Sequence, residues 1–382
     1  MRARLKSTLP FCRAIASALA FACCALSARA SLPASIFAPH STPAREEHQL
    51  ALFVLGISLL IFLGVSILLT YSILKFRARP NDDTEPPQVF GSMQIELSWT
   101  IIPILIIVVL FLGTARVLFS VQDAKKPANA LDLVVIGHQF WWEYRYPQYN
   151  VVAANELHIP VSPQDAPRPT FMKLTSADVI HSFWVPQLGG KTDLLPNRVN
   201  EMWIDPHTPG VYIGQCAQFC GAQHAKMLLR LSVDTPEDFD AWIKNQQRRQ
   251  TELAQAQVAM ASVPNPGNQS KGPPPNSPPT VLPAEAPDNA INAHNGQIVF
   301  EQQACINCHA VSGTMANGRY GPDLTHLMSR QTLGSGAMAN TPENLLGWIA
   351  DPSTFKPGCL MPAMHLNDRQ NAQITAYLLT LK

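Results

Sequence analysis

Two long runs without a charged residue place the strongest constraint on how this chain folds. The first extends from Leu50 to Leu74, and the second from Leu97 to Ala115. An α-helix rises about 1.5 Å per residue, so roughly 20 apolar residues are enough to cross the hydrocarbon core of a bilayer. Two such runs in tandem are improbable as buried helices of a water-soluble domain. They predict a hairpin of two transmembrane helices, at about residues 50–74 and 97–119, within a membrane region of residues 31–120.

The charges near this hairpin predict its orientation. Lys75, Arg77 and Arg79 lie between the two runs, and short loops rich in Lys and Arg stay on the cytoplasmic side. Both ends of the hairpin, and everything after about residue 120, are then expected on the outer side.

Charged residues make up 14% of the chain, and its net charge is +1. No basic stripe is interleaved with aromatic residues. We therefore exclude nucleic acid as a partner.

The N-terminus has the pattern of an export signal. Arg2, Arg4 and Lys6 precede a mostly apolar run, which is followed by Ala28-Arg29-Ala30 with small residues at positions 28 and 30. This pattern predicts a signal peptide over residues 1–30, cleaved after Ala30. A short anchor helix, or a lipid attached to one of the cysteines at positions 23 and 24, is the alternative. With the hairpin, this places the protein in the inner (cytoplasmic) membrane of a bacterium as a multi-pass protein in contact with lipid, with periplasmic outer domains.

The outer part divides into two modules joined by a linker. Residues 121–244 contain short β-rich runs such as LDLVVIG and MLLRLSV, separated by turn residues, which predicts an all-β sandwich. Residues 245–289 are rich in Gln and Ala and then in Pro, Asn and Ser, which is typical of an extended tether. Residues 290–382 predict a small all-α domain, with Thr341 and Asn367 as helix caps.

The α-helical module carries a haem-attachment motif. Cys305, Cys308 and His309 form the sequence CINCH, in which two thiols add to the vinyl groups of one haem and the histidine reaches its iron. A chance match or a thiol redox pair is the alternative. A methionine as the second axial ligand would leave no open site, which suits electron transfer. Met361 and Met364, in the sequence KPGCLMPAMHL, are the candidates, and Cys359 beside them has no predicted role.

Several further segments make this module similar to the mono-haem class I cytochromes c. They are Gly296 and Phe300 before the CINCH motif, GPDL at 321–324, the pair Met361-Pro362 and the closing AYLLTL. The resemblance implies one covalently bound haem c with His309 and Met361 as its axial ligands. Met328, Met338 and His365 are then packing or surface residues.

The β-rich module contains the segment CAQFCGAQHAKM at 216–227. A zinc site made from Cys216, Cys220, His224 and one further histidine is one interpretation, and a disulfide between the cysteines is another. Neither accounts for Met227, whose thioether is a soft ligand that copper accepts. A cysteine, a histidine and a methionine from one loop, with a histidine from an earlier strand, is typical of a cupredoxin, and His181 is the candidate for that earlier histidine. Two bridging thiolates could hold two coppers.

Residues 40–240 as a whole resemble subunit II of cytochrome c oxidase. The matching segments are ELSWTIIP, GHQFWWEYRYP, DVIHSFWVP, LGGKTDLLPNR and GQCAQFCGAQHAKM. The resemblance implies a dinuclear copper (CuA) centre of two copper ions. One copper would be bound by His181, Cys216, Cys220 and Met227, and the other by His224, both cysteines and the backbone carbonyl of Gln218.

Two positions depart from the pattern of that family. Gln218 stands where most members have a glutamate that reaches an interfacial magnesium or manganese ion, so that ion is in doubt here. Phe140 stands where many members have the tryptophan at which electrons enter, and we assign it no such role. Trp141 and Trp142 are candidates for that role or for the sandwich core. Other charged residues of family-like segments are expected to face the catalytic subunit or to be ordinary surface charge: Asp178, Lys191, Asp193 and Arg198.

Together the resemblances imply an electron relay in a haem-copper cytochrome c oxidase. Electrons would pass from the chain's own c-type haem through the dinuclear copper to a membrane-embedded catalytic subunit I, which reduces O2 to water while the complex translocates protons. The further partners implied are subunit III and an upstream donor such as a cytochrome c or a quinol-cytochrome c reductase. No catalytic residue is expected in this chain. A subunit of nitric oxide or nitrous oxide reductase, or a copper-binding protein without an oxidase partner, are the alternatives. His138, His158 and His207 are expected to be structural or exposed.

Overall fold

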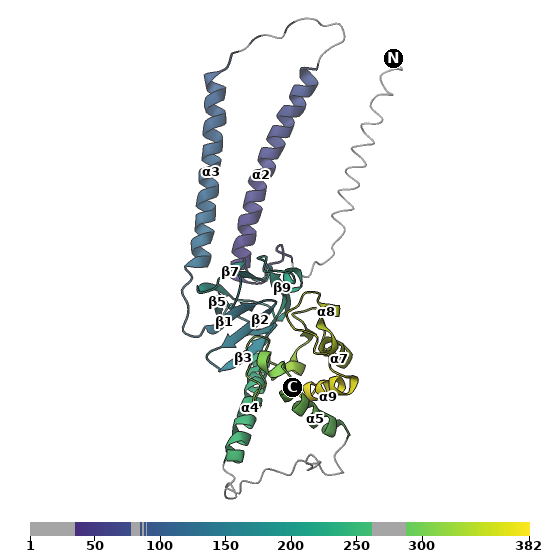
Figure 1. Ribbon diagram of the computed structural model, residues 1–382. Helices are drawn as coiled ribbons and strands as arrows, with labels where there is room; N and C mark the ends of the chain where they lie inside the picture. Colours follow the sequence, from purple (N-terminus) through teal and green to yellow (C-terminus); the bar gives the residue numbers. More distant parts are fainter. Residues whose placement is uncertain (1–34, 78–84, 86–87, 89, 262–287) are drawn as a thin grey trace, which may run out of the picture.

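The computed structural model describes residues 35–77, 85, 88, 90–261 and 288–382. The predicted signal peptide and residues 262–287 of the predicted linker lie outside the described residues. Within them the chain forms two long helices, a β-sandwich and a small helical domain (Figure 1). The predicted fold class, a membrane hairpin followed by an all-β and an all-α domain, is confirmed.

The two apolar runs form the long helices α2 (Thr42–Lys75) and α3 (Met93–Gln122). Both are long and apolar enough to cross a membrane. Helix α2 begins eight residues before the predicted start, because the Ser41 side chain caps it by accepting a hydrogen bond from Ala44 N. The carboxylate of Asp205, in the β-sandwich, accepts hydrogen bonds from Thr42 N and Thr42 Oγ1 at 2.7 and 2.6 Å. The foot of the hairpin is thereby attached to the outer domain.

The β-sandwich consists of two five-stranded sheets. The first has the order β3-β2-β1-β5-β8, with bounds Val151–Ala154, Trp141–Tyr146, Leu131–His138, Thr170–Ser176 and Asn200–Ile204. The second has the order β4-β10-β9-β6-β7, with bounds Glu156–Pro160, Leu228–Asp234, Gly210–Cys216, His181–Trp184 and Thr192–Leu194. Strands β1 and β5 pair in parallel, as do β10 and β4, and the other neighbours are antiparallel.

The core of the sandwich lies between the two sheets, where strand side chains alternate between the inside and the outside. Leu131, Leu133 and Val135 of β1 are buried, and so are Leu229 and Leu231 of β10. A side-chain period of two is what a strand with one buried face requires. The alternation fixes the register of the paired strands in each sheet. The register in turn determines which ends of the strands, and therefore which loops, lie next to one another.

The sandwich is followed by helix α4 (Pro236–Ala261), which corrects one prediction. Thr235 caps this helix, since its side chain accepts a hydrogen bond from Asp238 N at 3.2 Å. Phe239 and Ile243 of its first turns are buried in the sandwich core. The prediction that the tether begins at residue 245 is wrong for residues 245–261, because their Gln- and Ala-rich sequence has high helix propensity and continues a helix already anchored by packing.

The C-terminal domain is built on two crossing helices, α5 (Asp288–Gln302) and α9 (Asp368–Leu378). Its other elements are α6 (Cys305–Cys308), η2 (Leu327–Ser329), β11 (Thr332–Leu333), β12 (Met338–Ala339), α7 (Pro342–Ala350) and α8 (Pro352–Phe355). The predicted caps Thr341 and Asn367 are confirmed, since each accepts a backbone hydrogen bond at the start of its helix. At the crossing, Gly296 lies so close to the Gln373 carbonyl oxygen that a Cβ would come within 1.9 Å of it.

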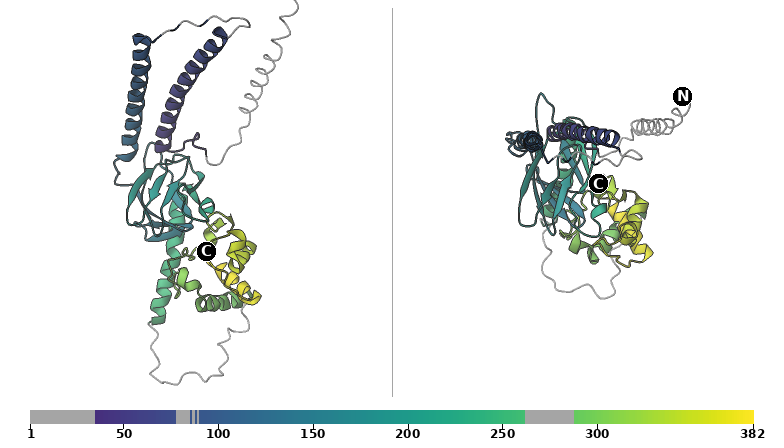
Figure 2. Two further views of the ribbon diagram at one scale, coloured as in Figure 1. Left: turned by 45° about the horizontal axis from the view of Figure 1, so that its top comes forward. Right: turned by 90° about the horizontal axis from the view of Figure 1, so that it is seen from above.

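The C-terminal domain lies beside the β-sandwich in every view (Figures 1 and 2). The carboxylate of Glu156, at the start of β4, accepts hydrogen bonds of 2.9 Å from Gln331 N, Thr332 N and Thr332 Oγ1. Ser335 and Leu228 exchange two more, with Ser335 Oγ donating to Leu228 O and Leu228 N donating to Ser335 O. The two domains therefore meet through directed polar contacts.

Candidate metal centres

One loop of the sandwich brings most of the predicted copper ligands together. This cysteine loop (residues 216–227) begins at the end of β9, includes the 3₁₀ turn η1 (His224–Lys226) and ends where β10 starts. Cys216 N donates to Met227 O at 2.9 Å, which closes the loop on itself. Strand β6 pairs with β9 at Phe183 and Cys216, so His181 at the start of β6 lies beside the first cysteine.

The side chains at this loop lie within a few ångströms of one another. His181 Nδ1 is 3.9 Å from Cys216 Sγ, and the two sulfurs are 3.9 Å apart. Cys220 Sγ is 3.7 Å from His224 Nδ1 and 3.8 Å from Met227 Sδ. The carbonyl oxygen of Gln218 lies 3.2 Å from Cys216 Sγ. All six groups predicted from the sequence are therefore gathered at one place, and both cysteines are free thiols.

His181 is held with one ring nitrogen toward the sulfurs. Its Nε2 lies 2.8 Å from Asp178 Oδ1 and donates to that carboxylate, which leaves Nδ1 facing Cys216. The ring fits because residue 137 is glycine, where a Cβ would lie 2.7 Å from the imidazole. A carboxylate behind a histidine is the arrangement that orients metal-binding imidazoles. Burial by itself would lower the pKa of His181, but the contacts with Asp178 and Cys216 outweigh it and raise that pKa.

The two thiols have different pKa values, so that Cys216 loses its proton before Cys220 does. The contact with Cys220 is the main cause that lowers the pKa of Cys216, and the nearby His181 lowers it further. The same contact raises the pKa of Cys220, because a second negative charge would stand beside the first. Both sulfurs bind a metal as thiolates, so a cation that binds here has to displace a proton from Cys220.

The donor set favours copper over zinc. Cys216, Cys220 and Met227 are 3, 4 and 0% exposed, and the first two form a group with His181 whose ligand atoms lie within 4.8 Å. Zinc sites are closed with nitrogen and thiolate ligands, whereas a buried thioether at the same place is a ligand that suits copper. The arrangement therefore fits the metal that the sequence predicts.

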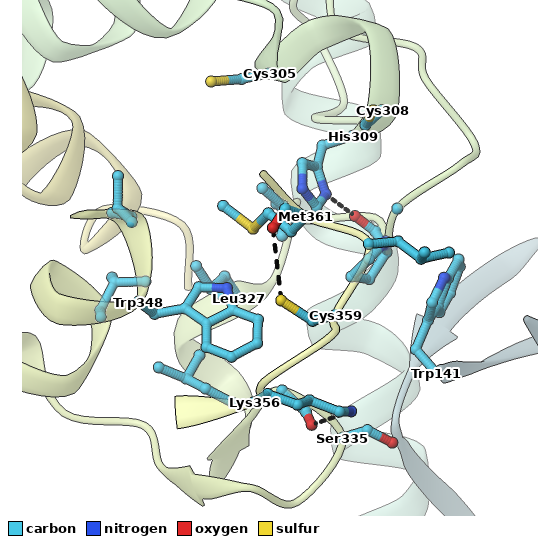
Figure 3. A pocket seen from close by; sticks show the side chains of 18 of the residues that line it. Trp141, Cys305, Cys308, His309, Leu327, Ser335, Trp348, Lys356, Cys359 and Met361 are labelled. Atoms are coloured by element: carbon cyan, nitrogen blue, oxygen red, sulfur yellow. Dashed lines mark hydrogen bonds between the residues drawn. The ribbon is translucent and has the colours of Figure 1, made fainter. Parts of the chain in front are cut away.

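The second candidate site is an apolar pocket in the C-terminal domain. Cys305, Cys308 and His309 line it together with Met361 (Figure 3). Its walls are mostly apolar, from Phe300, Leu324, Leu345, Trp348, Ile349, Ile374 and Leu378. A largely apolar pocket lined by two thiols fits a haem joined to the chain by its vinyl groups.

His309 is oriented to offer one nitrogen to the pocket. Its Nδ1 donates to Pro322 O at 2.8 Å, which leaves Nε2 as the free acceptor. Gly321 makes room for the ring, because a Cβ there would lie 2.6 Å from the imidazole. Burial lowers the pKa of His309, which keeps the imidazole neutral as an iron ligand has to be.

Both candidate methionines of the sequence line this pocket. Met361 and Met364 are among its lining residues, whereas Met328, Met338 and His365 are not. Cys359 also lines the pocket, and its sulfur donates to Met361 O at 3.5 Å. Position therefore reduces the choice of a second axial ligand to two methionines, and the preference for Met361 continues to depend on the pair Met361-Pro362.

The other histidines and charged residues considered from the sequence lie elsewhere. His138 contacts Glu143 and stacks on Trp141, and His158 contacts Asp234 and stacks on Trp242. His207 Nδ1 lies 3.1 Å from Ser162 O. Lys191, Asp193 and Arg198 are exposed on and beside β7, which lies near the foot of α2 (Figure 1).

The β-sandwich, called here the copper-type domain, forms part of the pocket of the C-terminal domain. The C-terminal domain and its pocket are called here the haem-type domain and the haem-type pocket. The sequence did not predict this shared construction. Gln139, Phe140 and Trp141, called here the shared wall, line the pocket from the sandwich side. Trp141 Nε1 donates to Tyr320 O in the C-terminal domain at 3.3 Å, and Lys356 Nζ donates to Phe140 O at 3.1 Å. Lys356 begins the segment KPGCLMPAMHL and Gln139 lies in GHQFWWEYRYP, but the sequence assigned neither residue a role, since both act through contacts between residues more than 80 positions apart.

The fold and the two sites define a membrane-anchored protein that joins a cupredoxin-like domain to a cytochrome c domain. Residues 31–116 match the family described as cytochrome C oxidase subunit II, transmembrane domain, and residues 131–233 match its periplasmic domain. Residues 293–382 match cytochrome c. These matches imply a CuA-type copper centre and a haem.

Individual relatives agree with the domain matches. The chain is 33% identical to cytochrome c oxidase subunit 2 of Alkalihalophilus pseudofirmus, with 86% of each chain covered. It is 36% identical to a probable cytochrome c oxidase subunit 2 of Rickettsia bellii, over 56% of this chain and 84% of that one. The crystal structure of the periplasmic domain of subunit II (CoxB) of Bradyrhizobium japonicum is 29% identical, with a TM-score of 0.30, and covers 32% of this chain and 97% of that chain.

The chain belongs to the cytochrome c oxidase subunit 2 family, and it is therefore a subunit of a haem-copper terminal oxidase. A subunit of this kind works with the catalytic subunit I of the complex. The relative from Alkalihalophilus aligns with more of the chain than the residues before 293 can supply, so the similarity extends into the cytochrome c domain.

Proposed function

We propose that this chain relays electrons within the oxidase, from a haem in its C-terminal domain to a dinuclear copper centre in its β-sandwich and on to the catalytic subunit. When bound, the haem and the copper pair supply reversible one-electron chemistry. Reduction of O2 to water takes place in the catalytic subunit, and the complex couples it to proton translocation. An upstream cytochrome c or a quinol-cytochrome c reductase supplies the electrons, subunit III completes the assembly, and the outer domains lie on the periplasmic side of a bacterial inner membrane.

The proposed ligands are the residues gathered at each site. His181, Cys216, Cys220, His224, Met227 and the carbonyl of Gln218 would hold two coppers. Cys305 and Cys308 would hold the haem covalently, with His309 and Met361 as axial ligands. Both thiolates would hold the copper pair, which would share one electron between its two ions.

The observation that carries this proposal is the shared wall. Gln139, Phe140 and Trp141 belong to the copper-type domain, yet they line the haem-type pocket. Gln139 Nε2 also donates to the carbonyl oxygen of Cys220 at 2.6 Å. A single residue thus spans from the haem-type pocket to a predicted copper ligand, which supports transfer within one chain.

Metal analysis and spectroscopy of the purified full chain test the proposal. We expect two coppers and one iron per chain, with an electron resonance signal of a mixed-valence copper pair. Replacing Cys216 or Cys220 with serine should abolish that signal and leave the iron content unchanged. One zinc in place of the coppers, or a copper signal that survives either replacement, contradicts the assignment.

A further inference from the structure

The loops that carry the predicted ligands of the two sites touch each other directly. The Met361 loop (residues 355–361) leads to the predicted haem ligand, and the cysteine loop carries the predicted copper ligands. Gln223 Nε2 donates to Pro357 O, and Lys226 Nζ donates to Phe355 O at 3.2 Å. Gly358, with φ of +82°, lies against Ala222, where an added Cβ would be 3.2 Å from the alanine Cβ. The two loops are therefore in contact without an intervening layer.

Lys356 occupies the centre of this contact. Its side chain is buried, and Nζ donates to Phe140 O at 3.1 Å and to Gly334 O at 2.9 Å. One acceptor belongs to the copper-type domain and the other to the haem-type domain, so the amine joins the two. Among the described residues Lys356 forms no ion pair with a carboxylate. Burying an amine is costly unless it is paired or hydrogen-bonded, and here the two carbonyls supply the hydrogen bonds.

The carbonyl that Lys356 holds belongs to the shared wall. Phe140 is buried and lines the pocket, and its ring lies 3.1 Å from where a Cβ of Gly221 would be, next to Cys220. The preceding residue, Gln139, donates to Cys220 O at 2.6 Å and lines the same pocket. The shared wall is thus held from one side by Lys356 and from the other by the cysteine loop.

We propose that Lys356 is a positioning residue for transfer between the two centres, which holds the shared wall between the haem pocket and the Cys220 carbonyl. This inference rests on the proposed relay. In each transfer one electron leaves the reduced haem iron and one electron reduces the copper pair, with no proton or bond exchanged. Burial lowers the pKa of Lys356 to about 8, and a neutral amine would keep its capacity to donate to both carbonyls.

The test compares three lysine variants of the full chain, loaded with haem and copper. Lys356→Met removes both donors at similar size. Lys356→Gln keeps an amide donor, and Lys173→Met, the control, changes an exposed residue of β5. We expect Lys356→Met to slow haem-to-copper transfer on the order of tenfold, because even a small displacement of the shared wall would lower the transfer rate. The transfer rate is measured after flash reduction of the haem. Lys173→Met should transfer at the parent rate.

Two readouts separate positioning from general damage. Haem and copper absorption spectra should be unchanged in Lys356→Met. Deuterium uptake should rise in peptides that cover residues 139–141 and 355–361 but not in those that cover 331–332, which Glu156 holds independently. Lys356→Gln, which keeps an amide donor, should transfer at a rate between those of the parent and Lys356→Met.

Two results would overturn the inference. The first is parent-like transfer and parent-like uptake in Lys356→Met, and the second is equal slowing in Lys173→Met. Failure of the proposed relay has a different signature, since the parent chain with both centres loaded would then show no haem-to-copper transfer. The uptake pattern of Lys356→Met would still report whether the lysine holds the shared wall.

Discussion

At the scale of single residues, the two sites depend on neighbouring groups that orient the ligands or leave room for them. Asp178 orients His181, and the Pro322 carbonyl orients His309. Gly137 and Gly321 leave the space that the two imidazoles occupy. Each of these groups is a backbone carbonyl, a glycine or an acidic side chain. The sequence alone does not show its role, because that role depends on which imidazole the fold places beside it.

Glu143 permits a prediction on acid stability. Burial alone would raise its pKa, but hydrogen bonds from His138 and Arg145 outweigh burial and lower the pKa of Glu143 below 4.5. Its ionised form therefore stabilises the fold fully above about pH 4.5, and this contribution is lost as the pH falls through the lower, folded-state pKa. Glu143→Gln should cost about 1.5–3 kcal/mol of unfolding free energy at pH 7.

Urea unfolding followed by tryptophan fluorescence, repeated at several pH values, checks this prediction. The difference between Glu143→Gln and the parent should shrink as the pH falls below 4.5. Asp240→Asn, an exposed change on α4, serves as the control. A difference that grows in acid would contradict the assigned sign.

At the scale of elements, the crossing of α5 and α9 forms the frame of the haem-type domain. Phe300 and Tyr377 pack across it with ring centroids 5.7 Å apart. Gly296 permits the close approach, since any side chain would collide with the carbonyl of Gln373. The crossing in turn places Ile374 and Leu378 on the wall of the pocket.

Gly296→Ala should therefore destabilise the C-terminal domain selectively. The added methyl group forces α5 and α9 apart, which costs about 1–3 kcal/mol or more when a packed core has to shift. Thermal unfolding followed at the haem absorption band should show a lower midpoint, with the copper signal unchanged. Asn292→Ala, at an exposed position of α5, should leave the midpoint near that of the parent. Equal midpoints for both variants would show that the close approach is not required.

At the scale of the whole molecule, the docking of the cytochrome c domain on the sandwich is the central feature. The predicted tether raises the effective concentration of one domain near the other. The contacts of Glu156, Lys356 and Ser335 then select one orientation among those that a tether allows. That orientation places the pocket against the shared wall.

Glu156→Gln should loosen this docking without changing either site. The carboxylate accepts several hydrogen bonds from the C-terminal domain, and weakening them costs on the order of 1.5–3 kcal/mol. Deuterium uptake at residues 331–332 should rise, and haem-to-copper transfer should slow, with metal content unchanged. Glu201→Gln, on the exposed part of β8, provides the matched control. Protection of residues 331–332 that equals the parent's would refute the role of Glu156.

Local patterns in the sequence determined the elements and most of the candidate ligands. The uncharged runs predict membrane helices because a bilayer admits few other structures, and CINCH and CAQFCGAQHAKM each place several ligands within a few residues. The predicted start of the tether at residue 245 is wrong, because the helix propensity of the following residues extends α4 to Ala261. Met361 and Met364 both line the pocket, so the choice of Met361 still depends on the resemblance through the pair Met361-Pro362.

Only the tertiary structure decided how the two sites are joined. Gln139, Glu156 and Lys356 received no role from the sequence, because each contacts a residue far away in the chain. Ligand spacing is a property of one segment and can be recognised in the sequence. A contact between domains depends instead on the packing of both surfaces, and that packing exists only once the sandwich and the C-terminal helices have formed.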